Sequence, residues 1–151
     1  MSLDRIRLAS LHDKVMNAEQ AAAFIQDGMT VGMSGFTRAG EAKAVPLALV
    51  KRAKADPLKI TLITGASLGN DLDKQLTEAG VLARRLPFQV DNTLRKAINK
   101  GEVMFIDQHL SETVEQMRNL QLKKPDVAVI EAVAITVDGG IIPTTSVGNS
   151  A

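Results

Sequence analysis

Short aliphatic segments alternate with helix-forming segments along almost the whole chain, and this order constrains the fold more than any other feature of the sequence. Three of the aliphatic segments, ITLIT at 60–64, VMFI at 103–106 and DVAVI at 126–130, have few strongly polar positions. Strands of this kind are buried on both faces, which is typical of parallel sheets. The sequence therefore predicts an α/β fold, with an open, mainly parallel sheet and helices on both faces.

The expected elements follow from capping and turn residues as well as from apolar patterning. Asn17 caps the first helix, Gln20 completes a capping box, Gly28 ends the segment, and Ser111 caps the last helix. The sequence predicts helices at 18–25, 44–55, 71–79, 92–100 and 111–122. It predicts strands at 29–33, 59–63, 82–86, 103–106 and 126–130, the last continuing over 132–137 to a turn at 138–140.

Composition excludes several classes of function. The chain has 151 residues, the size of one domain, with 18 basic and 17 acidic residues. A net charge of +1 provides no strong field for nucleic acid or an anionic membrane. The absence of cysteine excludes disulfides and thiolate catalysis, and two histidines make a metal site improbable. Because neither a signal peptide nor a bilayer-spanning apolar segment is visible, we expect a cytoplasmic protein without a metal.

Two loops of small residues are the first candidates for a binding site. Ser34–Gly40 follows one predicted strand and Thr64–Ser67 follows the next. Ligands of parallel sheets bind at the carboxyl ends of the strands, where both loops should lie. Free backbone N–H groups near Gly35 and Gly40 could hold an anion, and the Ser67 hydroxyl could donate to a carboxylate. The glycines could also serve only backbone geometry, and Ser67 could simply cap a turn.

The charged residues near these loops have equally open interpretations. Glu131 follows a strand and could act as a nucleophile, or could be a strand-end carboxylate held by backbone donors. Asp107 and His109 could act together in general-base catalysis, or could tie a loop to a helix N-terminus. The cations Arg38, Lys43, Arg84 and Arg85 could neutralise a ligand, and we expect them instead to be solvated surface charges.

Taken together and in order, these segments resemble the acetyl-CoA hydrolase/transferase family, the branch of class I coenzyme A transferases that includes succinyl-CoA:acetate CoA-transferase. The most specific segment is the last one, an Asp-Gly-Gly turn followed by PTTSVGNS. The resemblance rests on SGFTRAGEAKAVP (34–46), LITGAS (62–67), PF (87–88), INKGEVMFIDQHLS (98–111) and VAVIEAVAITVDGGIIPTTSVGNS (127–150).

The resemblance implies a glutamyl-CoA thioester mechanism in which the nucleophilic Glu lies outside this chain. Glu131 does not match that Glu, so no catalytic residue is assigned and the chain alone is expected to be inactive. Coenzyme A is then a substrate, and no cofactor or metal is implied. The resemblance implies that these residues line the substrate site: Ser34, Gly35, Phe36, Thr37, Gly65, Ala66, Ser67, Phe88, Ser146, Gly148 and Asn149.

The resemblance also sets expectations for the whole protein. Residues 1–151 would form a single truncated α/β domain, the N-terminal domain of a two-domain CoA transferase whose C-terminal half is missing. The partners would be acyl-CoA, short-chain carboxylates such as acetate and succinate, that missing half, and a second copy in a homodimer, with no nucleic acid or membrane. An acyl-CoA hydrolase and a non-catalytic small-molecule-binding domain remain as alternatives. Glu41–Lys43 and Val90 depart from the family pattern, which leaves acceptor specificity open.

Overall fold

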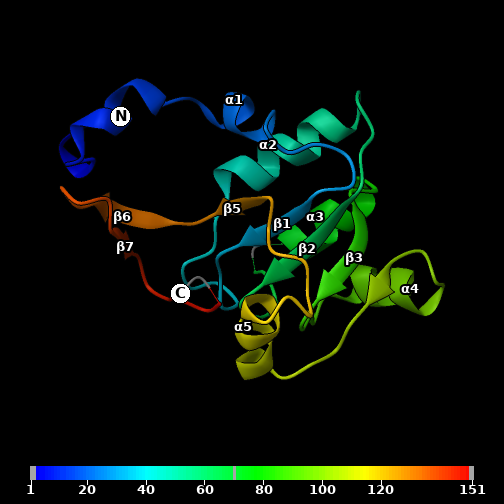
Figure 1. Ribbon diagram of the computed structural model, residues 1–151. Helices are drawn as coiled ribbons and strands as arrows, with labels where there is room; N and C mark the ends of the chain where they lie inside the picture. Colours follow the sequence, from blue (N-terminus) through cyan, green and yellow to red (C-terminus); the bar gives the residue numbers. More distant parts are fainter. Residues whose placement is uncertain (1–2, 70, 150–151) are drawn as a thin grey trace.

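A five-stranded parallel sheet forms the centre of the protein (Figure 1). The computed structural model describes residues 3–69 and 71–149. The strand order is β4–β3–β2–β1–β5, and every neighbouring pair is parallel. This order confirms the predicted mainly parallel α/β sheet. The strands are β1 (Thr30–Met33), β2 (Ile60–Thr64), β3 (Leu82–Leu86), β4 (Met104–Phe105) and β5 (Val127–Val129).

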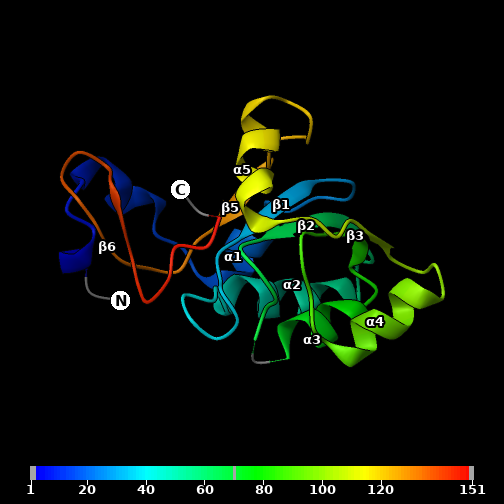
Figure 2. The same cartoon turned by 90° about the horizontal axis from the view of Figure 1, so that it is seen from below.

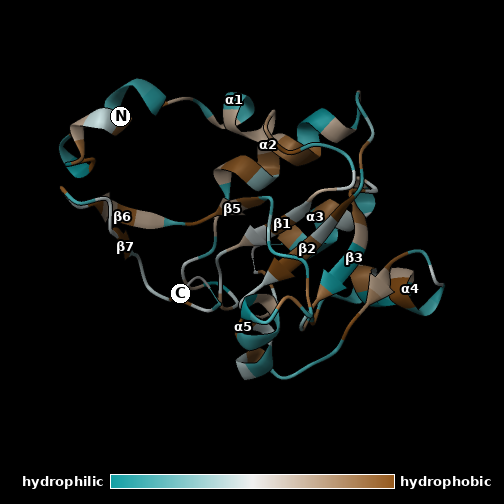
Figure 3. Cartoon of the chain, viewed as in Figure 1, coloured by the Kyte–Doolittle hydropathy of each residue, from teal (hydrophilic) through white to brown (hydrophobic). Residues whose placement is uncertain are grey.

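Helices cover both faces of the sheet, but unequally (Figure 2). One face carries α1 (Ala18–Ala22), α2 (Ala44–Ala53), α3 (Leu72–Glu78) and α4 (Asn92–Asn99), and the other carries only α5 (Leu110–Arg118). The aliphatic core lies under the four-helix face, where Val31 and Leu62 of the sheet and Leu49 of α2 are fully buried. Figure 3 shows the corresponding apolar colouring on α2 and β2.

The first helix is shorter than predicted. The Asn17–Gln20 capping box is present, as expected, but α1 ends at Ala22 rather than at Ile25. The guanidinium of Arg52 donates hydrogen bonds to the carbonyls of Ala22 (2.5 Å) and Ile25 (2.7 Å). Because this side chain satisfies carbonyls that would otherwise lack a partner, the chain can leave the helix early and bury Ile25 in the core.

The cap of the last helix also differs from the prediction. His109, not Ser111, is the N-cap of α5, and its Nδ1 accepts a hydrogen bond from the Ser111 backbone N–H. The reading of His109 as a residue that ties a loop to a helix start is therefore the one that the structure supports.

Strand β5 lies at the edge of the sheet, which the sequence did not predict. Its side chains are half-buried or exposed rather than buried, although its pairing with β1 is parallel as expected. The segment after it does not continue this strand. Instead β6 (Ala132–Ile135) turns at 138–140 and pairs antiparallel with β7 (Ile141–Pro143) in a separate two-stranded sheet.

The N-terminal segment packs beside this small sheet. Two short 3₁₀ helices, Leu3–Arg5 and Ala9–Lys14, lie next to β6 and β7 in Figures 1 and 2. The backbone N–H of Arg7 donates to the carbonyl of Ile135 at 2.9 Å. Among the described residues, no helix is both long and apolar enough to cross a membrane.

Candidate functional site

Three glycines bring three loops into backbone contact at the carboxyl ends of β1 and β2. A Cβ built on Gly65 would lie 2.7 Å from the Gly148 Cα and 2.7 Å from the Gly35 carbonyl oxygen. Such contacts are too short for any side chain, so only glycine permits this approach. The loop after β1, the loop after β2 and the segment 144–149 therefore form one surface.

Hydrogen bonds join the same three segments. Thr37 donates its backbone N–H to the Ser67 carbonyl (3.0 Å), and Gly69 donates to the Thr37 carbonyl (2.8 Å). The N–H of Gly40 donates to Thr145 Oγ1 (2.8 Å), and the Asn149 amide donates to the Thr64 carbonyl (3.1 Å). The predicted placement of the first two loops at adjacent strand ends is confirmed. The Gly40 N–H, expected to be free for an anion, is occupied by Thr145.

A buried ion pair supports the loop after β2. Arg85 of β3 and Asp73 of α3 are 0% and 1% exposed, with Nε and Oδ1 2.9 Å apart. The Arg85 Nη2 also donates to Asp73 Oδ2 (3.2 Å) and to the Ala66 carbonyl (3.1 Å). The expectation that Arg85 is a solvated surface charge is wrong, because its strand faces α3 at this position. The sequence does hold a signal: an arginine in strand 82–86, between Leu82 and Leu86, requires a partner wherever the sheet buries it.

The Ser67 side of the surface is a polar depression of about 340 Å³. Ser67 lines it together with Thr37 and Arg38. Ser67 is 2% exposed, and its backbone carbonyl is the group that accepts the Thr37 N–H. The rest of the depression is lined by the segments that lead into and begin α3 and α4: Leu68, Gly69, Asp71, Asp73, Val90, Asp91 and Asn92.

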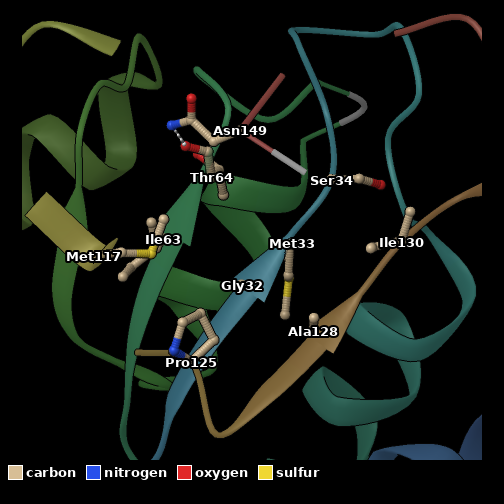
Figure 4. Close-up of a pocket in the computed structure, with 10 residues that line it drawn as sticks. All are labelled: Gly32, Met33, Ser34, Ile63, Thr64, Met117, Pro125, Ala128, Ile130 and Asn149. Carbon is tan, nitrogen blue, oxygen red and sulfur yellow. Dashed lines mark hydrogen bonds between the residues drawn. The ribbon is translucent and has the colours of Figure 1, made fainter. Parts of the chain in front are cut away.

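The opposite face of the sheet holds a second, mainly apolar cavity of about 100 Å³ under α5 (Figure 4). Ser34 and Asn149 lie at its rim, and Met117 of α5 reaches toward Ile63. Gly32, Met33, Thr64, Pro125, Ala128 and Ile130 complete the lining. Four of the predicted site residues thus line two separate hollows, Thr37 and Ser67 the first, and Ser34 and Asn149 the second.

Ser34 is engaged in the protein's own hydrogen bonds. Its hydroxyl donates to the Gly40 carbonyl (2.7 Å) and accepts from the Glu131 backbone N–H (2.8 Å). The Glu131 carboxylate pairs with Lys43 Nζ (2.5 Å) and accepts from Thr144 Oγ1 (2.7 Å). Because Lys43, and then Thr144, donate to the carboxylate, the pKa of Glu131 lies below its ordinary value of 4.5. Glu131 is therefore a held strand-end carboxylate, although its donors are side chains.

The remaining predicted residues lie around this surface. Phe36 and Phe88 are exposed at 47% and 44%, whereas Ala66 is buried. Ser146 contacts Gly40: a Cβ on Gly40 would lie 2.8 Å from the Ser146 carbonyl oxygen. Whether any of these residues touches a substrate stays a prediction. The described residues contain no group of three metal-ligating side chains.

Comparison with known proteins gives the family. Residues 2–151 match the acetyl-CoA hydrolase/transferase N-terminal domain. The chain is 45% identical over 149 residues to the succinyl-CoA:acetate CoA-transferase of Clostridium kluyveri, covering 97% of this chain and 28% of the relative. It is 41% identical to the propanoyl-CoA:succinate CoA transferase of Escherichia coli, covering 89% of this chain and 28% of that protein. It is 37% identical to the acetyl-CoA hydrolase of Schizosaccharomyces pombe, covering 97% and 30%.

Solved structures agree on the fold. An acyl-CoA transferase of Escherichia coli superposes with a TM-score of 0.54 at 16% identity, covering 69% of this chain and 22% of that one. The decarboxylase AibA/AibB gives a TM-score of 0.54 at 20% identity, covering 76% and 43%. The chain spans less than a third of the length of the curated relatives that it matches. It belongs to the acetyl-CoA hydrolase/transferase family, whose N-terminal domain it matches along almost its entire length.

Proposed function

We propose that this chain is the N-terminal domain of a CoA transferase that moves CoA between short-chain carboxylic acids of the acetate and succinate type. The observation that carries the proposal is the match of nearly the whole chain to such enzymes, at 45% and 41% identity. In the proposed reaction, the carboxylate of a Glu outside this chain attacks the acyl-CoA donor, whose acyl–sulfur bond breaks, and the products are a glutamyl-CoA thioester and the free donor carboxylate. The acceptor carboxylate then receives the CoA, with no metal or redox cofactor.

We assign the acceptor carboxylate to the polar depression beside Ser67. Ser67 brings a hydroxyl that can donate a hydrogen bond, and Arg38 is the cation that lines the same depression. The Arg38 side chain lies across Gly69, because a Cβ built on Gly69 would lie 2.7 Å from the Arg38 Cγ. Two of the nearby carboxylates are already engaged: Asp73 pairs with Arg85, and Asp91 accepts from the first amides of α4. Asp71 is the remaining carboxylate of the lining.

An acyl-CoA hydrolase is the second candidate, and one observation favours it. Several relatives are acetyl-CoA hydrolases, at identities from 34% to 39%. In that case water, rather than a carboxylate, would attack the glutamyl carbonyl of the thioester intermediate, which releases free CoA and restores the Glu carboxylate. The higher identity to the two transferases is why we place transfer first.

We further propose that the complete enzyme is a cytoplasmic homodimer, which fractionation and sedimentation of the full-length protein would test.

A chimaera tests the proposed function directly. This chain replaces the matching N-terminal segment of the Clostridium kluyveri transferase, and the product is assayed with succinyl-CoA in the presence and absence of acetate. We expect formation of acetyl-CoA to depend on acetate and to exceed the hydrolysis of succinyl-CoA. The 151-residue chain alone should produce neither.

Two outcomes would contradict the proposal. A folded chimaera that releases free CoA without forming acetyl-CoA would favour the hydrolase. A folded chimaera that lacks both activities, while the parent transferase is active, would favour a non-catalytic domain. Circular dichroism and a cooperative melt establish folding before either conclusion is drawn.

A further inference from the structure

The Asp73–Arg85 pair is an unusual component of the aliphatic layer between the sheet and the helices. Both side chains are almost completely buried, and the contacts between their charged groups are 2.9 and 3.2 Å long. Buried ion pairs contribute little net stability, because desolvation offsets their attraction, and apolar pairs of similar size often stabilise a fold equally well. The role of this pair should therefore be sought in the groups that it contacts beyond itself.

The pair binds the backbone on each side of Ser67. On one side, Arg85 Nη2 donates to the Ala66 carbonyl at 3.1 Å. On the other side, Asp73 Oδ2 accepts from the Leu68 N–H at 3.1 Å. Arg85 Nη1 also donates to the carbonyl of Leu86, which fixes the guanidinium to its own strand.

Ser67 itself is held through its backbone. Its carbonyl accepts the Thr37 N–H at 3.0 Å, which joins it to the first loop. The residue is only 2% exposed, yet it lines the polar depression together with Thr37 and Arg38. A hydroxyl on a residue that lines a depression, with its backbone fixed on both sides, is oriented before a ligand arrives.

We propose that the buried Asp73–Arg85 pair is the positioning device for Ser67, and that it fixes the Ser67 hydroxyl toward a carboxylate ligand in the polar depression. The identity of the ligand rests on the proposed function. The positioning does not, because it follows from the contacts to Ala66 and Leu68. Asp73 and Arg85 are accordingly positioning residues and not catalytic ones.

The test uses the ¹⁵N-labelled chain and two double variants. Asp73→Leu with Arg85→Met replaces the pair by apolar side chains and removes both contacts to the loop. Asp73→Asn with Arg85→Gln removes the charges and retains an acceptor for Leu68 and a donor for Ala66. In the apolar variant we expect amide exchange of Leu68 and Thr37 to accelerate about tenfold or more, with exchange of Val31 and Leu62 unchanged. In the amide variant we expect loop exchange near that of the parent.

Acetate titration then tests the ligand. We expect acetate to shift the Ser67 and Thr37 amide resonances of the parent, and the apolar variant to need several times more acetate for the same shift. Arg84→Met is the matched control, because Arg84 is a half-buried neighbour that lines a different hollow, beside Thr30 and Thr61. Its exchange and titration should match those of the parent.

The outcomes separate the two ideas. If exchange in the loop stays unchanged in the apolar variant, or rises only together with that of Val31 and Leu62, the positioning role is overturned. If exchange changes as expected but acetate shifts no amide in the parent, positioning holds and the carboxylate assignment of the proposed function fails. If acetate shifts the amide resonances of the parent and the apolar variant equally while loop exchange accelerates, the loop is positioned for something other than a carboxylate. The proposed role of the pair in carboxylate binding is then overturned.

Discussion

Gly65→Ala tests whether the contact between three glycines organises the candidate site. The added Cβ would lie 2.7 Å from the Gly35 carbonyl oxygen, 2.7 Å from the Gly148 Cα and 3.0 Å from the Asn149 backbone nitrogen. All three atoms belong to the backbone, so no side chain can turn aside to make room. Either the strand ends separate, or the segment 144–149 leaves the surface.

The structure indicates how large the effect should be. Overpacking of a well-packed site costs about 1–3 kcal/mol. The segment is tied by the hydrogen bonds of Thr144, Thr145 and Asn149, each contributing about 0.5–1.5 kcal/mol. The cost of keeping the segment in an overpacked site and the cost of losing its hydrogen bonds are thus similar. Detachment of the segment also returns conformational freedom to it. We therefore expect the segment to detach, with a loss of about 1–3 kcal/mol in the free energy of unfolding.

Urea denaturation and amide exchange measure both parts of this prediction. The Gly40 amide, which donates to Thr145, should lose its protection, while Leu62 in β2 should keep its own. Gly32→Ala is the matched control, because its Cβ would meet Pro125 at 3.4 Å, an ordinary contact. A Gly65→Ala protein as stable as the parent, with Gly40 still protected, would refute the reasoning.

Two further predictions concern the ties between the segments. The lowered pKa of Glu131 means that the Lys43 and Thr144 contacts stabilise the fold above about pH 4.5, and that this contribution is lost as pH falls through the lower, folded-state pKa. In urea titrations from about pH 6 to pH 3, the free energy of unfolding should therefore decline less steeply for Lys43→Met than for the parent. Equal slopes would contradict the stabilising role of the Lys43 contact. Thr145→Val should cost about 0.5–1.5 kcal/mol and expose the Gly40 amide to exchange, because its acceptor is removed, whereas an unchanged exchange rate would show that the contact is unimportant.

The parts of the fold that depend on local sequence could be predicted. Strands β1, β2 and β3 and the helices between them follow from short-range patterning, and the adjacency of the first two loops follows from the parallel pairing of β1 with β2. The Asp138–Gly140 turn is local as well. The hydrogen bonds that end α1 early are not, because Arg52 comes from a helix about thirty residues further along the chain.

The parts that depend on distant pairing could not be predicted. Nothing near Arg85 in the sequence shows that Asp73, on a different element, will neutralise it. In the same way, the side of the sheet on which a loop residue lies depends on the order of the strands, which local sequence does not show. The division between the Ser67 depression and the cavity beside Ser34 is therefore visible only in three dimensions.

The position of β5 changes what a charge in that strand should do. A buried strand would not tolerate Val129→Asp, because an unpaired buried charge costs several kcal/mol. Among the described residues β5 is an edge strand whose one partner is β1, and Val129 is half-buried. Water can reach a carboxylate there, so we expect a loss of about 1–3 kcal/mol and a chain that still folds cooperatively. Leu62→Asp is the comparison, since Leu62 is 0% exposed in β2, and it should abolish folding. Thermal melts of both variants decide the matter: a Val129→Asp protein as unfolded as Leu62→Asp would show that the edge of the sheet is buried in solution.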